Sequence, residues 1–475
     1  MAYRYGDRQQ RVLFPQSVDE YVPADAPVRA YDVIADSLDF EALGIKIEPH
    51  KVGAPPFDPK AMLKLLLYGY SYGVRSSRKL ERETYYNLSF IWLMGGLKPN
   101  YKTISEFRRL NKRALKKVLK QCARLCIDLD LIEGNTLFVD GSKVRASASI
   151  NNSWTKQKCL NRLKKIDERI DKILSECESV DHAERDDPSM VHMKKELSNN
   201  ETLKTKVSDI LNKLEAEGKT SLNTTDADCT KIHGRQGSHA GYNIQSVVDE
   251  KHGLIVSSNV VNENNDLHQF ANQIEQAHEV LAKKCLTACG DAGYADVNEL
   301  EKIDSQGVKV IVPSAKQAEK VKRSDPFDKA HFQYDEANDC YICPEGKVLR
   351  YSHTESQKLK MTYRAGVEVC RECKFLERCT TNAKGRTITR LHHEEVKKKL
   401  EVQYEQRQSQ EVYKLRKEKV ELPFGHIKHN LKVSGFLLRG LAGVKAEASI
   451  LSSCFNIARM ISIIGVAGLI TKLGG

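Results

Sequence analysis

The spacing of apolar and polar residues predicts several helices in the first quarter of the chain. An apolar, Leu-rich stretch at residues 61–72 follows Asp58-Pro59, a pair that is typical of a helix start. Over residues 102–120 apolar and basic residues recur at helical spacing, and Thr103 or Ser105 is available as the helix cap. We therefore expect this part of the chain to be all-α.

Beyond residue 131 the pattern changes to short runs of β-branched and apolar residues bounded by turn signals, which predict strands. Glu250-Lys251-His252-Gly253 separates two of these runs and indicates a hairpin turn. Three strands followed by alternating helix and strand is the order of a ribonuclease H-like core, a mixed α/β sheet flanked by helices. The expected elements are strands at 136–139, 143–150, 243–249, 254–261, 286–290 and 308–312 and a helix at 266–283.

Two segments interrupt this order and are predicted to be insertions. In residues 155–218 apolar residues recur at steps of three and four on both sides of Asp187-Pro188, which predicts a helical hairpin that serves in packing or dimerisation. Residues 325–386 contain a cluster of cysteines. We therefore expect an all-α domain at 1–130 and an α/β domain at 131–475 that holds both insertions. The predicted hairpin seams are Ile166, Ile170, Ile173, Cys177 and Val180 on one helix and Leu203, Val207, Ile210 and Leu214 on the other.

Composition narrows the classes of protein to consider. The formal net charge is +12, with 75 basic and 63 acidic residues, which favours a polyanionic partner. No apolar stretch reaches the roughly 20 residues of a membrane span, and the uncharged run at 460–471 is expected to be a buried helix. The N-terminal residues contain no apolar signal core, so we expect a cytoplasmic protein whose 13 cysteines are reduced or metal-bound.

Basic residues dominate the helix expected at residues 102–120, which holds eight Lys or Arg and one acid, Glu106. One interpretation is the solvated face of an amphipathic helix, and the other is a face that contacts nucleic-acid phosphates. The candidates for phosphate contact are Arg108, Arg109, Lys112 and Arg113.

Three acids are expected at the ends of elements. Asp140 follows the apolar run Leu137-Phe138-Val139, Asp291 lies in Cys289-Gly290-Asp291-Ala292-Gly293-Tyr294, and Glu421 precedes Leu422-Pro423-Phe424-Gly425. Carboxylates at the ends of neighbouring strands can converge although they are far apart in sequence. Hard oxygen ligands of this kind suit two divalent cations about 3.5–4 Å apart, which is the arrangement used in phosphoryl transfer. Asp266 is a further acid that would either cap a helix or join the site.

These motifs resemble those of the DDE transposases of bacterial insertion sequences. Val-Asp-Gly-Ser-Lys around Asp140 resembles the first motif of the family, and Cys-Gly-Asp-Ala-Gly-Tyr around Asp291 resembles the second. The third motif, Tyr, Arg, Glu and Lys in order, maps onto Tyr413, Arg416, Glu421 and Lys428, with one extra residue between the Arg and the Glu. Three other strings are similar to the family: Gly241-Tyr242-Asn243-Ile244-Gln245, Asn264-Asn265-Asp266 and Phe436-Leu437-Leu438-Arg439-Gly440.

The resemblance implies an enzyme that binds the terminal inverted repeats of a mobile element, cuts double-stranded DNA there and transfers the strand to target DNA. Asp140, Asp291 and Glu421 would bind two Mg²⁺ or Mn²⁺ ions per active site. Lys428 and Arg416 would contact DNA phosphates, and Glu421 and Lys428, seven residues apart on a helix, would share a face. Pairing two DNA ends implies a homodimer in the active complex. The resemblance also implies that the protein acts at the bacterial nucleoid.

Two alternatives stand beside this interpretation. One is a DNA-binding protein that derives from a transposase and is catalytically silent. The other is a metal-dependent nuclease without strand transfer. A cleavage assay on labelled element ends, with and without Mg²⁺, distinguishes the three.

The cysteine cluster predicts a structural zinc site. Cys340 and Cys343 form one C-x-x-C pair and Cys370 and Cys373 another, and four thiolates suit tetrahedral Zn²⁺. Cys379 is a fifth candidate that could replace one of the four. Such a site is closed and therefore structural rather than catalytic.

Overall fold

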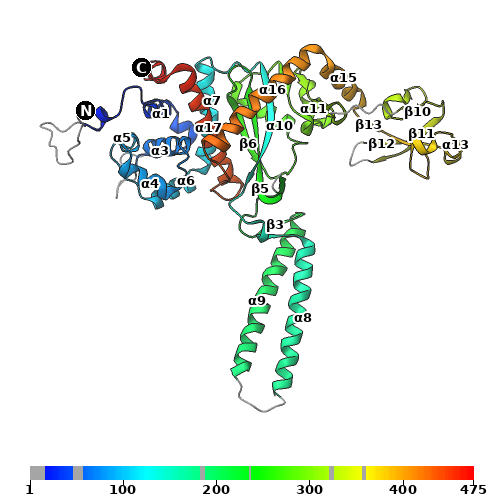
Figure 1. Cartoon of the computed structure of the whole chain (residues 1–475), viewed down its shortest axis with the longest axis horizontal. Helices are drawn as coiled ribbons and strands as arrows, with labels where there is room; N and C mark the ends of the chain where they lie inside the picture. The colour runs from blue at the N-terminus through cyan, green and yellow to red at the C-terminus, as the bar shows by residue number, and fades with distance from the viewer. Residues whose placement is uncertain are drawn as a thin grey trace, which may run out of the picture. The chain divides into compact units, whose positions relative to one another are not determined.

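The chain folds into two compact units, each of which combines segments distant in sequence (Figure 1). The computed structural model describes residues 17–45, 57–181, 188–234, 237–319, 326–355 and 360–474. The first unit comprises Met1–Asp266, Asn272–Cys285 and Lys417–Gly475, and the second comprises Leu267–Ala271 and Leu286–Arg416.

The N-terminal part of the first unit is helical, as the sequence predicts. Pro59 begins α3, and the Asp58 carboxylate accepts a hydrogen bond from the Lys60 N–H at 3.0 Å, which confirms the predicted helix start. The long basic helix expected from Thr103 is instead two helices that meet at Asn111, and Asn100 caps the first of them. The helices are α1 (Pro27–Asp36), α2 (Phe40–Leu43), α3 (Pro59–Ser71), α4 (Ser77–Tyr86), α5 (Leu88–Leu93), α6 (Tyr101–Leu110) and α7 (Lys112–Asp128).

The C-terminal helix α17 (Leu441–Ile464) is the central core element of this unit. It packs against α3, α7 and the strand β6 (Ile255–Val261), so the helical region continues into the sheet without a break at the expected boundary near residue 130. α17 is long and apolar enough to cross a membrane, but 67% of its apolar window is buried, as expected of a core helix. Gly465, at φ 80°, ends it, so the run at 460–471 is divided between α17 and α18 (Val466–Leu473).

The strands of the first unit form an antiparallel arrangement around β5 (Gly237–Asp249). β1 (Thr136–Arg145) pairs with β5 in a continuous register from Leu137↔Asp249 to Arg145↔Gly241. β4 (Thr230–Gly234) and β6 pair with the other edge of β5. Asp140 therefore lies inside a strand, and the prediction that the strand ends at Val139 is wrong.

The first insertion is the predicted helical hairpin. α8 (Lys156–Asp181) and α9 (Pro188–Ala216) run side by side, and the short strands β2 (Ser153–Trp154) and β3 (Leu222–Asn223) pair at their base (Figure 1). Cys177, Val180 and Asp187 lie outside the part of the chain whose side chains are described. Among the described seam residues, Ile166, Ile170, Leu203, Val207, Ile210 and Leu214 pack in one cluster, and Ile173 is fully buried, which confirms the seams.

The second unit begins with the parallel strands β7 (Thr287–Cys289) and β8 (Lys309–Ile311). Its insertion is a five-stranded antiparallel sheet in the order β13-β12-β11-β10-β9. The remaining elements are η3 (Ala292–Tyr294), α11 (Val297–Asp304), α12 (Ala315–Ala318), η4 (Lys329–His331), β9 (Gln333–Asp335), β10 (Cys340–Ile342), β11 (Val348–Glu355), β12 (Lys360–Ala365), α13 (Val367–Arg371), α14 (Leu376–Cys379), β13 (Thr387–Leu391) and α15 (Glu394–Glu405).

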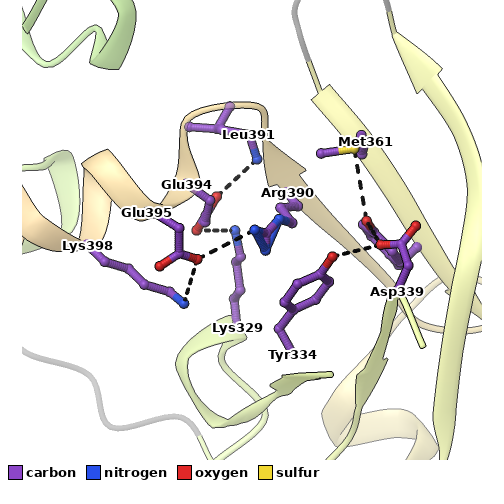
Figure 2. A network of polar contacts seen from close by, with 10 residues as sticks. Lys329, Tyr334, Asp339, Met361, Arg390, Leu391, Glu394, Glu395 and Lys398 are labelled. Carbon is purple, nitrogen blue, oxygen red and sulfur yellow. Dashed lines mark hydrogen bonds and ion pairs between the residues drawn. The ribbon is translucent and has the colours of Figure 1, made fainter. Parts of the chain in front are cut away.

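A polar network fastens this small sheet to α15 (Figure 2). The buried Glu394 carboxylate accepts hydrogen bonds from Lys329 Nζ at 2.6 Å and from the Leu391 N–H at 3.0 Å. The Arg390 guanidinium lies 3.8 Å from the centre of the Tyr334 ring. A buried ion pair without such partners would be costly, so these bonds fix where the sheet joins the helix.

Taken together, these elements make the chain a mixed α/β protein with a helical N-terminal region.

Candidate active site

The first motif and the third motif meet on one face of β1. Side chains alternate along a strand, so Asp140 and Ser142 point to the same face. Lys428 Nζ donates a hydrogen bond to Ser142 Oγ at 2.6 Å. Burial lowers the pKa of Lys428, and the nearby Asp140 carboxylate opposes this shift. The structure therefore places a cation of the third motif beside the acid of the first.

Ser142 is a candidate site residue that the sequence alone did not point to. It is buried and lies two positions after Asp140, the spacing that puts two strand residues on one face. The alternation was hidden because the apolar run ends at Val139.

Asp266 belongs to the opposite face of β1. Its Oδ1 accepts hydrogen bonds from Asn243 Nδ2 at 2.7 Å and from Gln245 Nε2. Gln245 lies opposite Gly141 in the register, and a Cβ at Gly141 would lie 2.5 Å from Asp266 Oδ1. Glycine after Asp140 is therefore required for Asp266 to pack there. The strings at residues 241–245 and 264–266 thus contact each other through these hydrogen bonds, on the face of β1 opposite to Asp140.

Glu421 lies near the end of α16 (Arg407–Gly425) and is exposed. Pro423 is inside this helix, where it lacks the N–H that would bond to the preceding turn. A π-helical segment, η6 (His426–Asn430), follows directly and contains Lys428. The expectation that Glu421 and Lys428 share a helix face assumed regular α-helix over the seven residues between them. That assumption is wrong, because a π-helical segment begins at His426.

The string at residues 436–440 is held by a buried acid of α17. Glu447 is 1% exposed and accepts hydrogen bonds from Arg75 Nη1 and from the N–H groups of Leu437 and Leu438, each at 2.9 Å. Asp226 Oδ1 accepts from the Gly440 N–H at 3.2 Å. These bonds fix the loop that joins η6 to α17.

In the second unit, Asp291 acts electrostatically on Tyr413, a residue of the third motif. Asp291 caps η3, and its carboxylate accepts a hydrogen bond from the Gly293 N–H at 2.8 Å. The Arg416 guanidinium lies 5.6 Å from the centre of the Tyr413 ring. Burial raises the pKa of Tyr413, Arg416 opposes the shift and Asp291 adds to it, so the three groups interact. The fold brings Asp291, Tyr413 and Arg416 together.

Arg108 does not fit the prediction that it contacts DNA. It is 6% exposed, and its Nη1 donates to Tyr70 Oη at 3.0 Å and to the Arg75 carbonyl at 2.9 Å. Ile104, one helical turn earlier, is also buried, so residue 108 lies on the apolar face of α6. Arg108 is a structural group of the helical region.

The other candidates for DNA contact lie nearer the surface. Arg109 is exposed and bonded to Glu106, with Nε 2.8 Å from a carboxylate oxygen. Arg113 is exposed and Lys112 is half-buried. Arg113 also lines a groove of about 480 Å³ whose other walls come from β6 and α10 (Phe270–Leu281). The same groove is lined by Lys116, Lys117 and Lys120.

The residues that the structure describes contain no assembled group of metal ligands. Among the described residues, no group of three or more His, Cys, Asp or Glu side chains is placed to hold a metal ion. Asp140 and Glu421 belong to the first unit and Asp291 to the second. The donor chemistry nevertheless fits Mg²⁺ or Mn²⁺, because carboxylate oxygens are the hard ligands that these ions prefer.

Two family comparisons agree with the sequence interpretation. Residues 16–110 match a family described as Transposase domain (DUF772), and residues 342–461 match a Transposase DDE domain. No curated protein and no solved structure matches the chain. The first match covers the helical region through α6, and the second contains Glu421 and Lys428. The two matches support the identification of the chain as an insertion-sequence DDE transposase, as its motifs predict.

Proposed function

We propose that this transposase binds the terminal inverted repeats of its insertion sequence, cleaves the DNA there and joins the freed end to target DNA. The observation that carries the proposal is the bond between Lys428 and Ser142 beside Asp140. It pairs the third family motif with the first within one compact unit. Because the acids are required for this chemistry, a silent DNA-binding protein would have no need of them.

The catalytic acids would be Asp140, Asp291 and Glu421. They would hold two Mg²⁺ or Mn²⁺ ions, which supply activation of the attacking water and stabilisation of the leaving oxygen. Asp140 lies on a paired strand inside the sheet, so its carboxylate is held on a rigid element. Asp291 is oriented by its cap bond to Gly293.

Lys428 and Arg416 would position the DNA strand. The Lys428 ammonium is held by Ser142 and can offer a second donor to a phosphate oxygen, because an ammonium carries three N–H donors. Arg416 lies with Asp291 and Tyr413, where a guanidinium could bind a phosphate with two parallel bonds. Each residue would thus place a scissile phosphate near a catalytic acid.

DNA-end binding would use the basic residues of α6 and α7, namely Arg109, Lys112 and Arg113. These residues are positively charged, as is the chain as a whole with its net charge of +12, and positive charge favours binding to DNA phosphates. Cleavage of two ends would require a homodimer in the active complex, and the protein would act in the cytoplasm at the nucleoid.

The test is a cleavage and joining assay with labelled element ends and an unlabelled target. The proposal predicts Mg²⁺-dependent cuts at the element boundary followed by joined products. Cuts without joined products would indicate a nuclease, and binding without cuts would indicate a silent DNA-binding protein.

A further inference from the structure

We propose that the small sheet of the second unit carries a structural zinc site formed by Cys343, Cys370, Cys373 and Cys379, and that Cys340 is not a ligand. This inference is independent of the DNA chemistry proposed above. It differs from the ligand set that the two C-x-x-C pairs suggest, in that Cys379 takes the place of Cys340.

Cys340 lies in a strand, next to a residue that faces the buried cluster of the small sheet. It lies within β10, which pairs with β9 on one edge and β11 on the other. Tyr341 belongs to the buried core cluster of this sheet. Because neighbouring side chains of a strand point to opposite faces, Cys340 and Ile342 face away from that cluster. Cys343, which follows the strand, packs against the cluster, so the two thiols of this C-x-x-C pair lie in different surroundings.

The remaining thiols gather on one side. Cys343, Cys370 and Cys379 all pack against the cluster that contains Tyr341. The thiols that act electrostatically on Cys379 are those of Cys370, Cys343 and Cys373. Three segments of the insertion thus place the four proposed ligands in one neighbourhood.

Two of the local backbones are shaped for a thiolate. After Cys343 the chain turns through Gly346, at φ 73°, and the Lys347 N–H lies 3.3 Å from Cys343 Sγ as a donor. Cys370 and Cys373 lie at the end of α13, where the Cys373 N–H donates to the Cys370 carbonyl at 3.1 Å. In such a helical turn residues three apart share a face, unlike those of a strand.

Four cysteine ligands suit tetrahedral Zn²⁺, with Zn–S distances of about 2.3 Å. No three of the described cysteines are already placed to hold an ion, so the proposed site requires the four sulfurs to move closer together. Each thiol would release its proton to solvent on binding. The site would fasten α13 and α14 to the turn after β10, while the aromatic core already holds the strands.

The test compares the zinc content of purified full-length protein with that of two matched variants, Cys340→Ser and Cys379→Ser, by elemental mass spectrometry. The proposal predicts about one zinc per chain in the wild type and in Cys340→Ser, and a several-fold loss in Cys379→Ser. Retention by Cys379→Ser with loss from a folded Cys340→Ser would overturn the ligand set. A wild type without zinc would overturn the site.

A measurement on the wild type alone covers the case in which a variant does not fold. Alkylation of each cysteine is followed by peptide mass spectrometry with and without a zinc chelator. Chelation should raise the labelling of Cys343, Cys370, Cys373 and Cys379 and leave Cys340, which is 7% exposed, unchanged. Protection of Cys340 but not Cys379 by zinc would contradict the proposal.

Discussion

The salt dependence of DNA binding distinguishes contact residues from structural ones in the basic region. The variant replaces Arg109, Lys112 and Arg113 with Gln together. Each lost phosphate contact on duplex DNA should flatten the plot of log affinity against log salt by about 0.9. Lys112 and Arg113 are in no ion pair within the described part of the chain, so their loss alone should lower the slope by about 1.8.

Arg109 differs from these two residues because it already forms an ion pair with Glu106. Exposed ion pairs are weak, generally below about 1 kcal/mol, so a phosphate can replace the carboxylate. A full contribution from Arg109 brings the expected decrease in slope to about 2.7. The ratio of the wild-type affinity to the variant affinity should then fall about 40-fold as the salt concentration rises from 50 to 200 mM.

The assay is fluorescence anisotropy with labelled element ends at several salt concentrations. The matched control replaces Arg162, Lys164 and Lys165, three exposed basic residues of α8, with Gln and so removes the same charge. The control should keep the wild-type slope within about one contact. Equal slopes for the wild type and the α6–α7 variant would refute the assignment of these residues to DNA contact.

Three other variants test separate parts of the structure. Arg108→Gln should keep the wild-type salt slope but lose about 3 kcal/mol of unfolding free energy in urea denaturation, because two bonds from a buried guanidinium are removed; a stable variant with a flattened slope would contradict its structural role. Glu447→Leu should lose roughly 3–5 kcal/mol by the same measurement, because Arg75 is left buried without its carboxylate, and wild-type stability would show that the pair contributes nothing. Lys428→Ala should slow cleavage about 10- to 100-fold without loss of end binding, since one charge-assisted bond is lost. Because burial lowers the pKa of Lys428, this residue loses its charge at a lower pH than an ordinary lysine. Lys428→Arg should therefore move the alkaline limb of the plot of cleavage rate against pH to higher pH, and an unmoved limb would exclude Lys428 as its source.

Local patterns predicted the helices well. Asp58-Pro59 marked the start of α3, and the apolar seams of α8 and α9 were visible from steps of three and four residues. Both signals depend on neighbours within one or two helical turns, which the sequence displays directly. The junction at Asn111 was not visible, because basic and apolar residues keep helical spacing across it.

Long-range pairing was harder to predict. β1 continues past Val139 because its second half pairs with β5, about 100 residues later in the chain, and no local apolar pattern records this. The candidate site shows the same limit, since Ser142 became recognisable only once Lys428 was seen to bond to it. The sequence also does not show that Cys340 lies in a strand while Cys343 follows it, because that depends on pairing with β11. Arg108 is different, because its helical spacing from Ile104 already indicated the buried face.

The measurement that tests the central proposal most directly is Mg²⁺-dependent cleavage of element ends by Asp140→Ala, Asp291→Ala and Glu421→Ala. Each variant should bind the ends as tightly as the wild type and cut no faster than the wild type does without Mg²⁺, because each would lack one metal ligand. Asp209→Ala, which removes an exposed acid of α9, is the matched control and should cut normally. Near-normal cleavage by any one of the three folded variants would contradict the assignment of these acids to the catalytic site.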